Sequence, residues 1–149
     1  MAWGARVELV TAARHPDRFD RLVLSDLSID PEDPDAQKAG GIAAKAERAA
    51  AGIAEAARPE GWNTHDDPHE AVKALAATRR LPDLMPFVEQ VSMPTLIATG
   101  DHDPNLVSSR RALAGFADAR LEVLPHTGHG SVMHRPDLAA ELVLGFLAG

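Results

Sequence analysis

The chain has 149 residues, 45% of them hydrophobic and 25% charged, a balance typical of a single soluble globular domain. Its formal net charge of -7 is spread along the sequence without a run of Lys or Arg, so we expect no nucleic-acid partner. The absence of cysteine excludes disulfides and thiolate catalysis. Since neither a signal peptide nor an apolar stretch of about 18 residues is evident, we expect a cytoplasmic protein without membrane contacts.

The N-terminal segment predicts a helix and then a strand. Residues 3–14 have apolar side chains at helical spacing, with Val7, Val10 and Thr11 on one side, and a His-Pro pair ends the pattern. Residues 21–26 form a short continuous apolar run, which is typical of a strand buried on both faces of a parallel sheet. A helix followed by such a strand begins an α/β pattern.

The middle of the chain, residues 29–90, has a different composition. Its alanine-rich stretch over residues 36–57 favours helix. Two further helices are predicted at about 68–78 and 82–90, and Pro68 suits the first turn of the earlier one. We therefore predict a helical insert between two strands.

The α/β rhythm returns in the C-terminal third of the chain. Short apolar runs alternate with longer helical patterns there. The predicted elements are a strand at 95–99, a helix at 105–116, a strand at 120–124 and a closing helix at 136–147. The sequence thus predicts about three parallel strands flanked by helices, with residues 1–28 and 91–149 forming the core and residues 29–90 the insert.

Two short motifs follow successive predicted strands. The string MPTLIATGDHDPNLVSS places Gly100 and Asp103 after one strand, and LPHTGHG places Gly128 and His129 after the next. Because the carboxyl ends of parallel strands meet at one edge of a sheet, we expect these side chains to converge. A histidine can take a proton from a nucleophile while a carboxylate fixes its tautomer. The two motifs therefore offer a candidate acid, either Asp103 or Asp101, and a candidate base, His129.

This order of elements and motifs resembles the C-terminal portion of the α/β-hydrolase superfamily. The resemblance implies a partial α/β-hydrolase fold, with Asp103 and His129 as two members of a catalytic triad and a small molecule as substrate. The helical insert resembles the cap that many members have over the active site, where it excludes water. Asp26, at the end of the first strand, could be the acid in the variant where that residue comes one strand earlier.

The third member of such a triad is missing. In the family the nucleophile lies in Gly-x-Ser-x-Gly at a sharp turn between a strand and a helix, and the motif does not occur here. Counting back from His15 by the usual helix length puts Ala2 in the nucleophile's position. If this count is wrong by two residues, the nucleophile lies just before Met1. We expect a truncated gene product, a miscalled start, or a half-protein that needs a missing N-terminal half or self-association at the open edge of the first strand.

The resemblance implies hydrolysis of a small ester or related acyl substrate in the complete protein, with this chain alone inactive. An epoxide hydrolase is disfavoured, because those enzymes use lid tyrosines and this chain has no tyrosine. The alternative is a non-catalytic module that binds a small molecule or a partner. We expect no cofactor and no metal, because H-E-x-x-H spacing is absent among the other histidines, which include His65, His69, His102, His126 and His134.

Overall fold

A computed structural model describes most of the chain, and the predicted helix at 68–78 lies largely outside the described part. The described residues are 1–57, 60–61, 67, 69–70, 73 and 82–149. The elements are α1 (Trp3–Arg14), η1 (Pro16–Arg18), β1 (Leu22–Ser25), α2 (Pro34–Ala50), α4 (Met85–Val88), β2 (Thr95–Gly100), α5 (Asn105–Leu113), β3 (Ala119–Leu124), α6 (Ser131–His134) and α7 (Pro136–Ala148).

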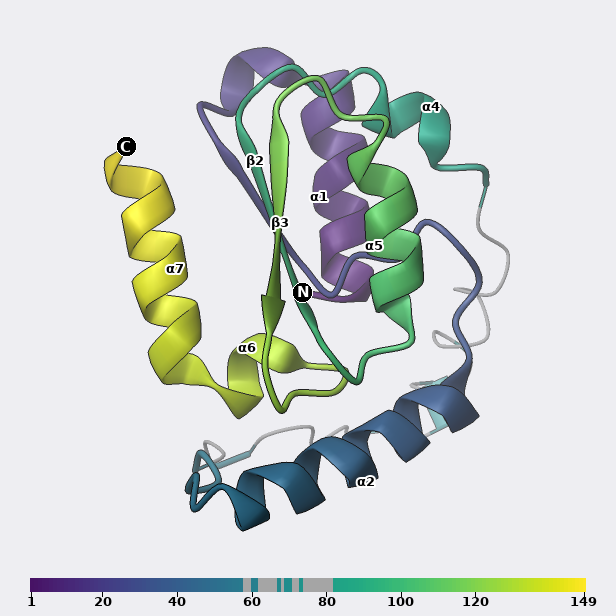
Figure 1. Ribbon diagram of the computed structural model, residues 1–149. Helices are drawn as coiled ribbons and strands as arrows, with labels where there is room; N and C mark the ends of the chain where they lie inside the picture. Colours follow the sequence, from purple (N-terminus) through teal and green to yellow (C-terminus); the bar gives the residue numbers. More distant parts are fainter. Residues whose placement is uncertain (58–59, 62–66, 68, 71–72, 74–81) are drawn as a thin grey trace.

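The three strands form one parallel sheet in the order β1-β2-β3, with Leu22 opposite Thr95 and Thr95 opposite Ala119. Figure 1 shows α1 and α5 on one face of this sheet and α7 on the other. All six residues of β2 are buried, as expected for the central strand of a sheet that is covered on both faces. The predicted arrangement of three parallel strands with flanking helices is confirmed.

Helix α1 is buried on the side that carries its small apolar residues and Leu9. Ala5 and Leu9 are fully buried in the core, whereas Val7 is 49% exposed and Thr11 is also exposed. The sequence predicted the helix and placed Val7, Val10 and Thr11 on one side of it without assigning the buried side; of these three residues, Val10 packs against the core. The alanines of α1 allow its backbone to pack closely on the sheet, and this close packing decides which side is buried.

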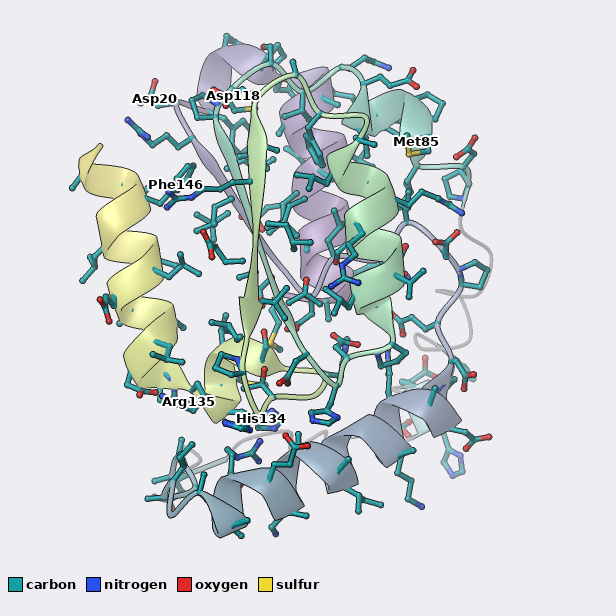
Figure 2. All side chains as sticks on the ribbon, in the orientation of Figure 1. Asp20, Met85, Asp118, His134, Arg135 and Phe146 are labelled. Atoms are coloured by element: carbon teal, nitrogen blue, oxygen red, sulfur yellow. The ribbon has the colours of Figure 1, made fainter. Side chains whose placement is uncertain are left out.

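Helix α7 covers the other face of the sheet through an aromatic side chain. Phe146 points from α7 toward the sheet (Figure 2), and its ring lies 5.4 Å from the guanidinium carbons of both Arg21 and Arg120. Arg21 also donates a hydrogen bond of 3.0 Å to the Phe146 carbonyl. No helix in the described parts of the chain is long and apolar enough to cross a membrane.

Helix α2 lies across the carboxyl ends of the strands (Figure 1). The Asp33 side chain caps its first turn by accepting from the backbone N–H groups of Asp35 and Ala36, and Pro34 occupies a first-turn position. These local signals explain why a helix begins here, although the insert has few large apolar side chains to bury.

Glycine allows α2 to approach the loops that follow β2 and β3. A Cβ atom added at Gly40 would lie 2.0 Å from the His102 carbonyl oxygen, and one added at Gly128 would lie 2.9 Å from the Cα of Gly41. The buried guanidinium of Arg48 also donates 2.6 Å to the His126 carbonyl. The insert helix is therefore fixed against both loops by backbone contact and by a charged hydrogen bond.

Alanine substitution at the two neighbouring glycines of α2 should have opposite effects. Gly41→Ala should raise the free energy of unfolding by up to about 1 kcal/mol, because its Cβ would meet nothing within 4 Å and alanine favours helix. Gly40→Ala should lower it by about 1–3 kcal/mol, because its Cβ would collide with a backbone oxygen. Urea unfolding, with amide exchange of α2, measures both. A change of the same sign in the two variants would contradict the close contact.

Candidate active site at the carboxyl ends of the strands

The loops after β2 and β3 pack directly on each other. The backbone N–H of His102 donates 3.0 Å to the Thr127 carbonyl. A Cβ added at Gly100 would lie 2.3 Å from that same carbonyl oxygen, so glycine is required for the close approach. This contact brings Asp103, on the first loop, close to His129, on the second.

Asp103 and His129 form a hydrogen-bonded pair. The Nδ1 atom of His129 lies 3.1 Å from Oδ2 of Asp103, whose side chain is fully buried, while the His129 side chain is 24% exposed. The second carboxylate oxygen accepts from the backbone N–H of Asn105 at 3.0 Å. An imidazole held through Nδ1 in this way keeps Nε2 for proton transfer. The arrangement can therefore accept a proton and return it.

The surroundings of His129 favour its protonated form. Burial by itself would lower the pKa of this imidazole, but the hydrogen bond and the negative charge of Asp103 act against burial, and the pKa is raised above its ordinary value. A smaller contribution of the same sign comes from the charge of Asp26. His129 is thus a stronger base than a free histidine side chain.

The two alternative acids have other partners. Asp101 accepts hydrogen bonds from the backbone N–H groups of His126 and Thr127 at 2.8 and 2.9 Å, and so holds the turn after β3. The carboxylate of Asp26 accepts from the Ser131 N–H at 3.2 Å and from the Ser25 hydroxyl at 2.9 Å. Of the three predicted acids, the structure brings Asp103 to Nδ1 of the histidine.

Asp26 is a strained and buried residue next to the Asp103–His129 pair. Its backbone φ is 53°, in the left-handed region that non-glycine residues rarely adopt, and its side chain is 0% exposed. Burial raises its pKa to about 6, the hydrogen bond from Ser131 lowers it, and the charge of Asp103 raises it. By holding the N-terminus of α6, Asp26 fixes the segment that follows His129.

Ala2 has an unusual backbone conformation at the start of α1. Its φ is 50° and its ψ is -119°, and its N–H donates 2.7 Å to the carbonyl of Ser25 at the end of β1. A positive φ is strained for a residue with a side chain. A strained turn that leads into a helix is where the nucleophile lies in Gly-x-Ser-x-Gly proteins. This geometry supports the alignment of Ala2 with that position, and Ala2 supplies only a methyl group.

Several solved structures resemble this arrangement. An α/β-hydrolase enzyme from a Medee basin deep-sea metagenome library is 22% identical, with a TM-score of 0.65 over 99% of this chain and 62% of that one. An esterase from Thermogutta terrifontis is 20% identical, with a TM-score of 0.69 over 99% of this chain and 62% of that one. The fold is that of an α/β-hydrolase. An enol-lactonase from Burkholderia xenovorans is 22% identical, with a TM-score of 0.64 over all of this chain and 64% of that one.

The chain spans less than two thirds of these α/β-hydrolases. It is also 36% identical over 80 residues to a 2-hydroxy-6-oxononadienedioate/2-hydroxy-6-oxononatrienedioate hydrolase of Klebsiella pneumoniae, a match that covers 52% of this chain and 28% of the relative. No protein-family model matches. The three-stranded sheet is thus one part of the α/β-hydrolase fold, as the sequence predicted.

Two residues at this candidate site were not predicted from the sequence. The side chain of Asn105 donates to the Asp26 carbonyl at 3.2 Å and lies 3.4 Å from Nδ1 of His129, and Ser131 holds Asp26 through its N–H. The position of Asn105 two residues after Asp103 was the available signal, because its backbone N–H closes a short turn on that carboxylate.

The substitution Asp26→Asn should change stability in a pH-dependent way. A carboxyl group whose pKa is about 6 when folded, against an ordinary value of 3.8, costs the fold stability progressively as the pH rises from about 4 to 6. Asparagine is neutral and tolerates the left-handed region. The free energy of unfolding of the variant, taken relative to that of wild type, should therefore rise by on the order of 1–3 kcal/mol between pH 4.5 and pH 7.5. Urea unfolding at the two pH values measures this, and an equal difference at both would contradict the raised pKa.

The pKa of His129 should fall when the charge of Asp103 is removed. In Asp103→Asn the imidazolium loses the partner that contributes most to raising its pKa, so burial is opposed less strongly and the pKa should lie below that of wild type. NMR titration of the ring protons measures it. Asp101→Asn is the matched control, because Asp101 contacts the turn after β3 instead of the ring. An unchanged His129 pKa in Asp103→Asn would contradict the pairing.

Proposed function

We propose that the complete protein hydrolyses a small ester or related acyl substrate through a covalent acyl-enzyme. The observation that carries the proposal is the 3.1 Å contact between Asp103 Oδ2 and His129 Nδ1 at the carboxyl ends of the strands. In this proposal His129 is the general base and then the general acid, and Asp103 orients it and stabilises the imidazolium.

The proposed reaction assigns each proton. Nε2 of His129 takes the proton of a nucleophilic hydroxyl as its oxygen bonds to the substrate carbonyl carbon, and then gives the proton to the departing alcohol. Water next loses a proton to the same nitrogen as its oxygen bonds to the acyl carbon; the acyl–enzyme bond then breaks, the nucleophile's oxygen takes that proton back from Nε2, and the free acid leaves. Ala2 cannot supply the hydroxyl. We therefore propose that the chain by itself is inactive and that hydrolysis belongs to a complete form that has a nucleophile.

Two relatives support acyl chemistry by name. One is an enol-lactonase and another is an esterase, and a lactone is a cyclic ester. A fold can host many reactions, however, so the proposal rests on the acid–base pair and takes the substrate class from these relatives only as support. A carbonyl with a leaving oxygen is the feature shared by the proposed substrates.

Residues 29–90 are proposed to act as a cap over this site. Helix α2 supports the idea because it lies across the carboxyl ends of the strands, and because Gly40 and Gly41 touch the loops after β2 and β3. A cap in this position would exclude water from the acyl-enzyme and limit the size of the substrate.

The free edge of β1 is proposed to be the place for a further part of the sheet. Among the described residues, β1 pairs with β2 along one edge. At the end of β1, the carbonyl oxygen of Ser25 accepts a hydrogen bond from the Ala2 N–H. An unpaired edge favours the addition of another strand. We propose an N-terminal half of the α/β-hydrolase fold as the partner, with self-association as the alternative.

A second candidate function is favoured by one observation. Ala2 keeps the strained backbone of a nucleophile position but presents a methyl group there. A protein that retains the scaffold and the cap without the nucleophile could bind a small molecule or a partner without catalysis. The candidate predicts binding with no turnover.

The Ala2 position provides the test. The wild-type chain should hydrolyse p-nitrophenyl acetate at the rate of buffer alone, whereas Ala2→Ser should react covalently with a fluorophosphonate probe. A general base typically contributes 10²–10⁴-fold, so the labelling rate of Ala2→Ser should fall at least about tenfold when His129→Ala is added. Mass spectrometry locates the label.

Each result decides between the candidates. Labelling of Ala2→Ser that depends on His129 supports the acid–base pair and identifies Ala2 as the missing nucleophile's position. Saturable wild-type hydrolysis that is lost in His129→Ala would show that the chain has a nucleophile of its own. A folded Ala2→Ser variant that reacts no faster than wild type would oppose the catalytic proposal and leave the binding candidate.

A further inference from the structure

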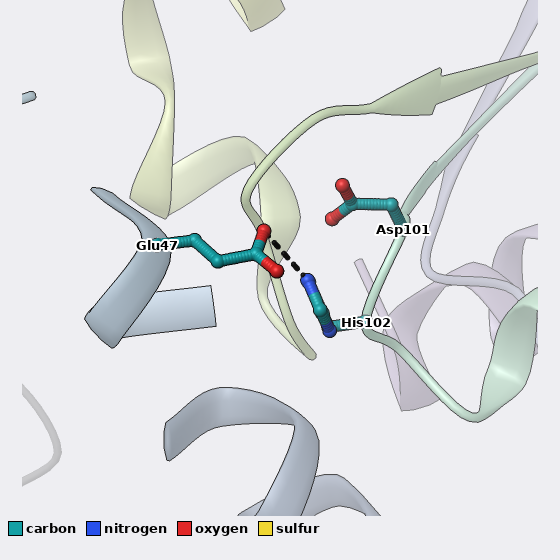
Figure 3. Close-up of side chains that lie close together, drawn as sticks. All are labelled: Glu47, Asp101 and His102. Atoms are coloured by element: carbon teal, nitrogen blue, oxygen red, sulfur yellow. Dashed lines mark ion pairs between the residues drawn. The ribbon is translucent and has the colours of Figure 1, made fainter. Parts of the chain in front are cut away.

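A second cluster of polar side chains lies where α2 meets the two loops. Figure 3 shows Glu47 of α2 pointing toward His102, with Asp101 beside them on the loop after β2. One ligand-type atom of each of these three side chains lies within 4.8 Å of the other two. We refer to these three residues and His126, which follows β3, as the Glu47 cluster.

Two imidazoles converge on one carboxylate oxygen in the Glu47 cluster. Oε2 of Glu47 lies 2.9 Å from Nε2 of His102 and 3.0 Å from Nδ1 of His126. The hydrogen bonds with His126 and His102 lower the pKa of Glu47, so its carboxylate is ionised at neutral pH. Carboxylate and imidazole groups, which come from segments far apart in sequence, thus face one another.

The surrounding contacts hold these groups in place. Asp101 is fixed by the backbone N–H groups of His126 and Thr127, and each of its oxygens keeps a further lone pair. Helix α2 is fixed by the hydrogen bond from Arg48 to the His126 carbonyl and by the contact of Gly40 with His102. Side chains that are held before an ion arrives lose less freedom when it binds.

We propose that Glu47, Asp101 and His102 bind a divalent transition-metal ion, with Zn²⁺ as the ion that fits best. Imidazole nitrogen with carboxylate oxygen is a ligand set of Zn²⁺ and its neighbours, whereas Mg²⁺ and Ca²⁺ prefer oxygen alone. A tetrahedral ion with bonds of about 2.1 Å holds its ligands about 3.4 Å apart. The contact of Glu47 with His102 is close to that spacing, and a carboxylate oxygen of Asp101 lies within 4.8 Å of the ligand atoms of both.

The proposed ion has a structural role. It joins α2 to the loop that leads to Asp103 and to the loop that leads to His129, so it reinforces the contacts made by Gly40 and Arg48. A ligand that binds only the folded form stabilises it in proportion to the logarithm of its concentration. The proposal does not depend on the hydrolytic function, since neither Asp103 nor His129 is a ligand.

The experiment uses the full chain, without an affinity tag, after EDTA treatment and dialysis. Titration with ZnCl₂ in a calorimeter should give one ion per chain, and the same addition should raise the melting temperature. Co²⁺ should give the visible absorption of a four-coordinate ion. Glu47→Gln keeps the shape of the side chain and His102→Ala removes one imidazole, and each should weaken Zn²⁺ binding at least tenfold. Circular dichroism checks that both variants fold.

Matched controls are available at Glu8 on α1 and at His15, which directly follows α1, since both residues are exposed. Glu8→Gln and His15→Ala remove the same chemical groups and should leave Zn²⁺ affinity unchanged. Absence of binding for Zn²⁺, Ni²⁺ and Co²⁺ would overturn the proposal, and so would binding that is equally strong in Glu47→Gln and His102→Ala. In either case the Glu47 cluster would be a set of hydrogen bonds between α2 and the loops.

Discussion

The backbone contact between the loops after β2 and β3 determines the geometry of the site. The strands are parallel and in register up to Gly100 and Leu124, so their carboxyl ends lie at the same level of the sheet. Gly100 then allows the Thr127 carbonyl to come so close that any side chain at this position would collide with it. Asp103 and His129 meet because these loops are fixed. The backbone contact thus brings the two side chains together, and the hydrogen bond between them orients the imidazole ring.

Two buried carboxylates, Asp103 and Asp26, lie near the His129 imidazole and have different roles. Asp103 is placed to hold the His129 imidazolium, whereas Asp26 receives backbone and hydroxyl hydrogen bonds and has a raised pKa. Two neighbouring carboxylates in a low-dielectric site do not both ionise without cost. The raised pKa of Asp26 therefore makes it the carboxyl group that is easily neutralised while it anchors α6, and Asp103 is the carboxylate in contact with the imidazole.

The sequence predicted those features that depend on local patterns. The bounds of α1 and the positions of the three strands follow from apolar spacing, and the convergence of Asp103 with His129 follows from the rule for parallel strand ends. Which side of α1 is buried does not follow from the spacing alone, since Ala5 and Leu9 are buried while the larger Val7 is exposed. The contact of Gly40 with the His102 carbonyl joins distant segments, and no local pattern indicates it.

The strained backbone conformation of Ala2 is determined by the surrounding fold and not by its side chain. A positive φ at a non-glycine residue costs on the order of 1–3 kcal/mol, and a methyl group gains nothing from that strain. The conformation persists because the Ala2 N–H pairs with the Ser25 carbonyl while α1 begins at the next residue, so the surrounding fold determines the turn. The backbone at position 2 would therefore determine the direction in which any side chain at this position points. The turn at Ala2 is thus set by β1 and α1, and it does not depend on the side chain at that position.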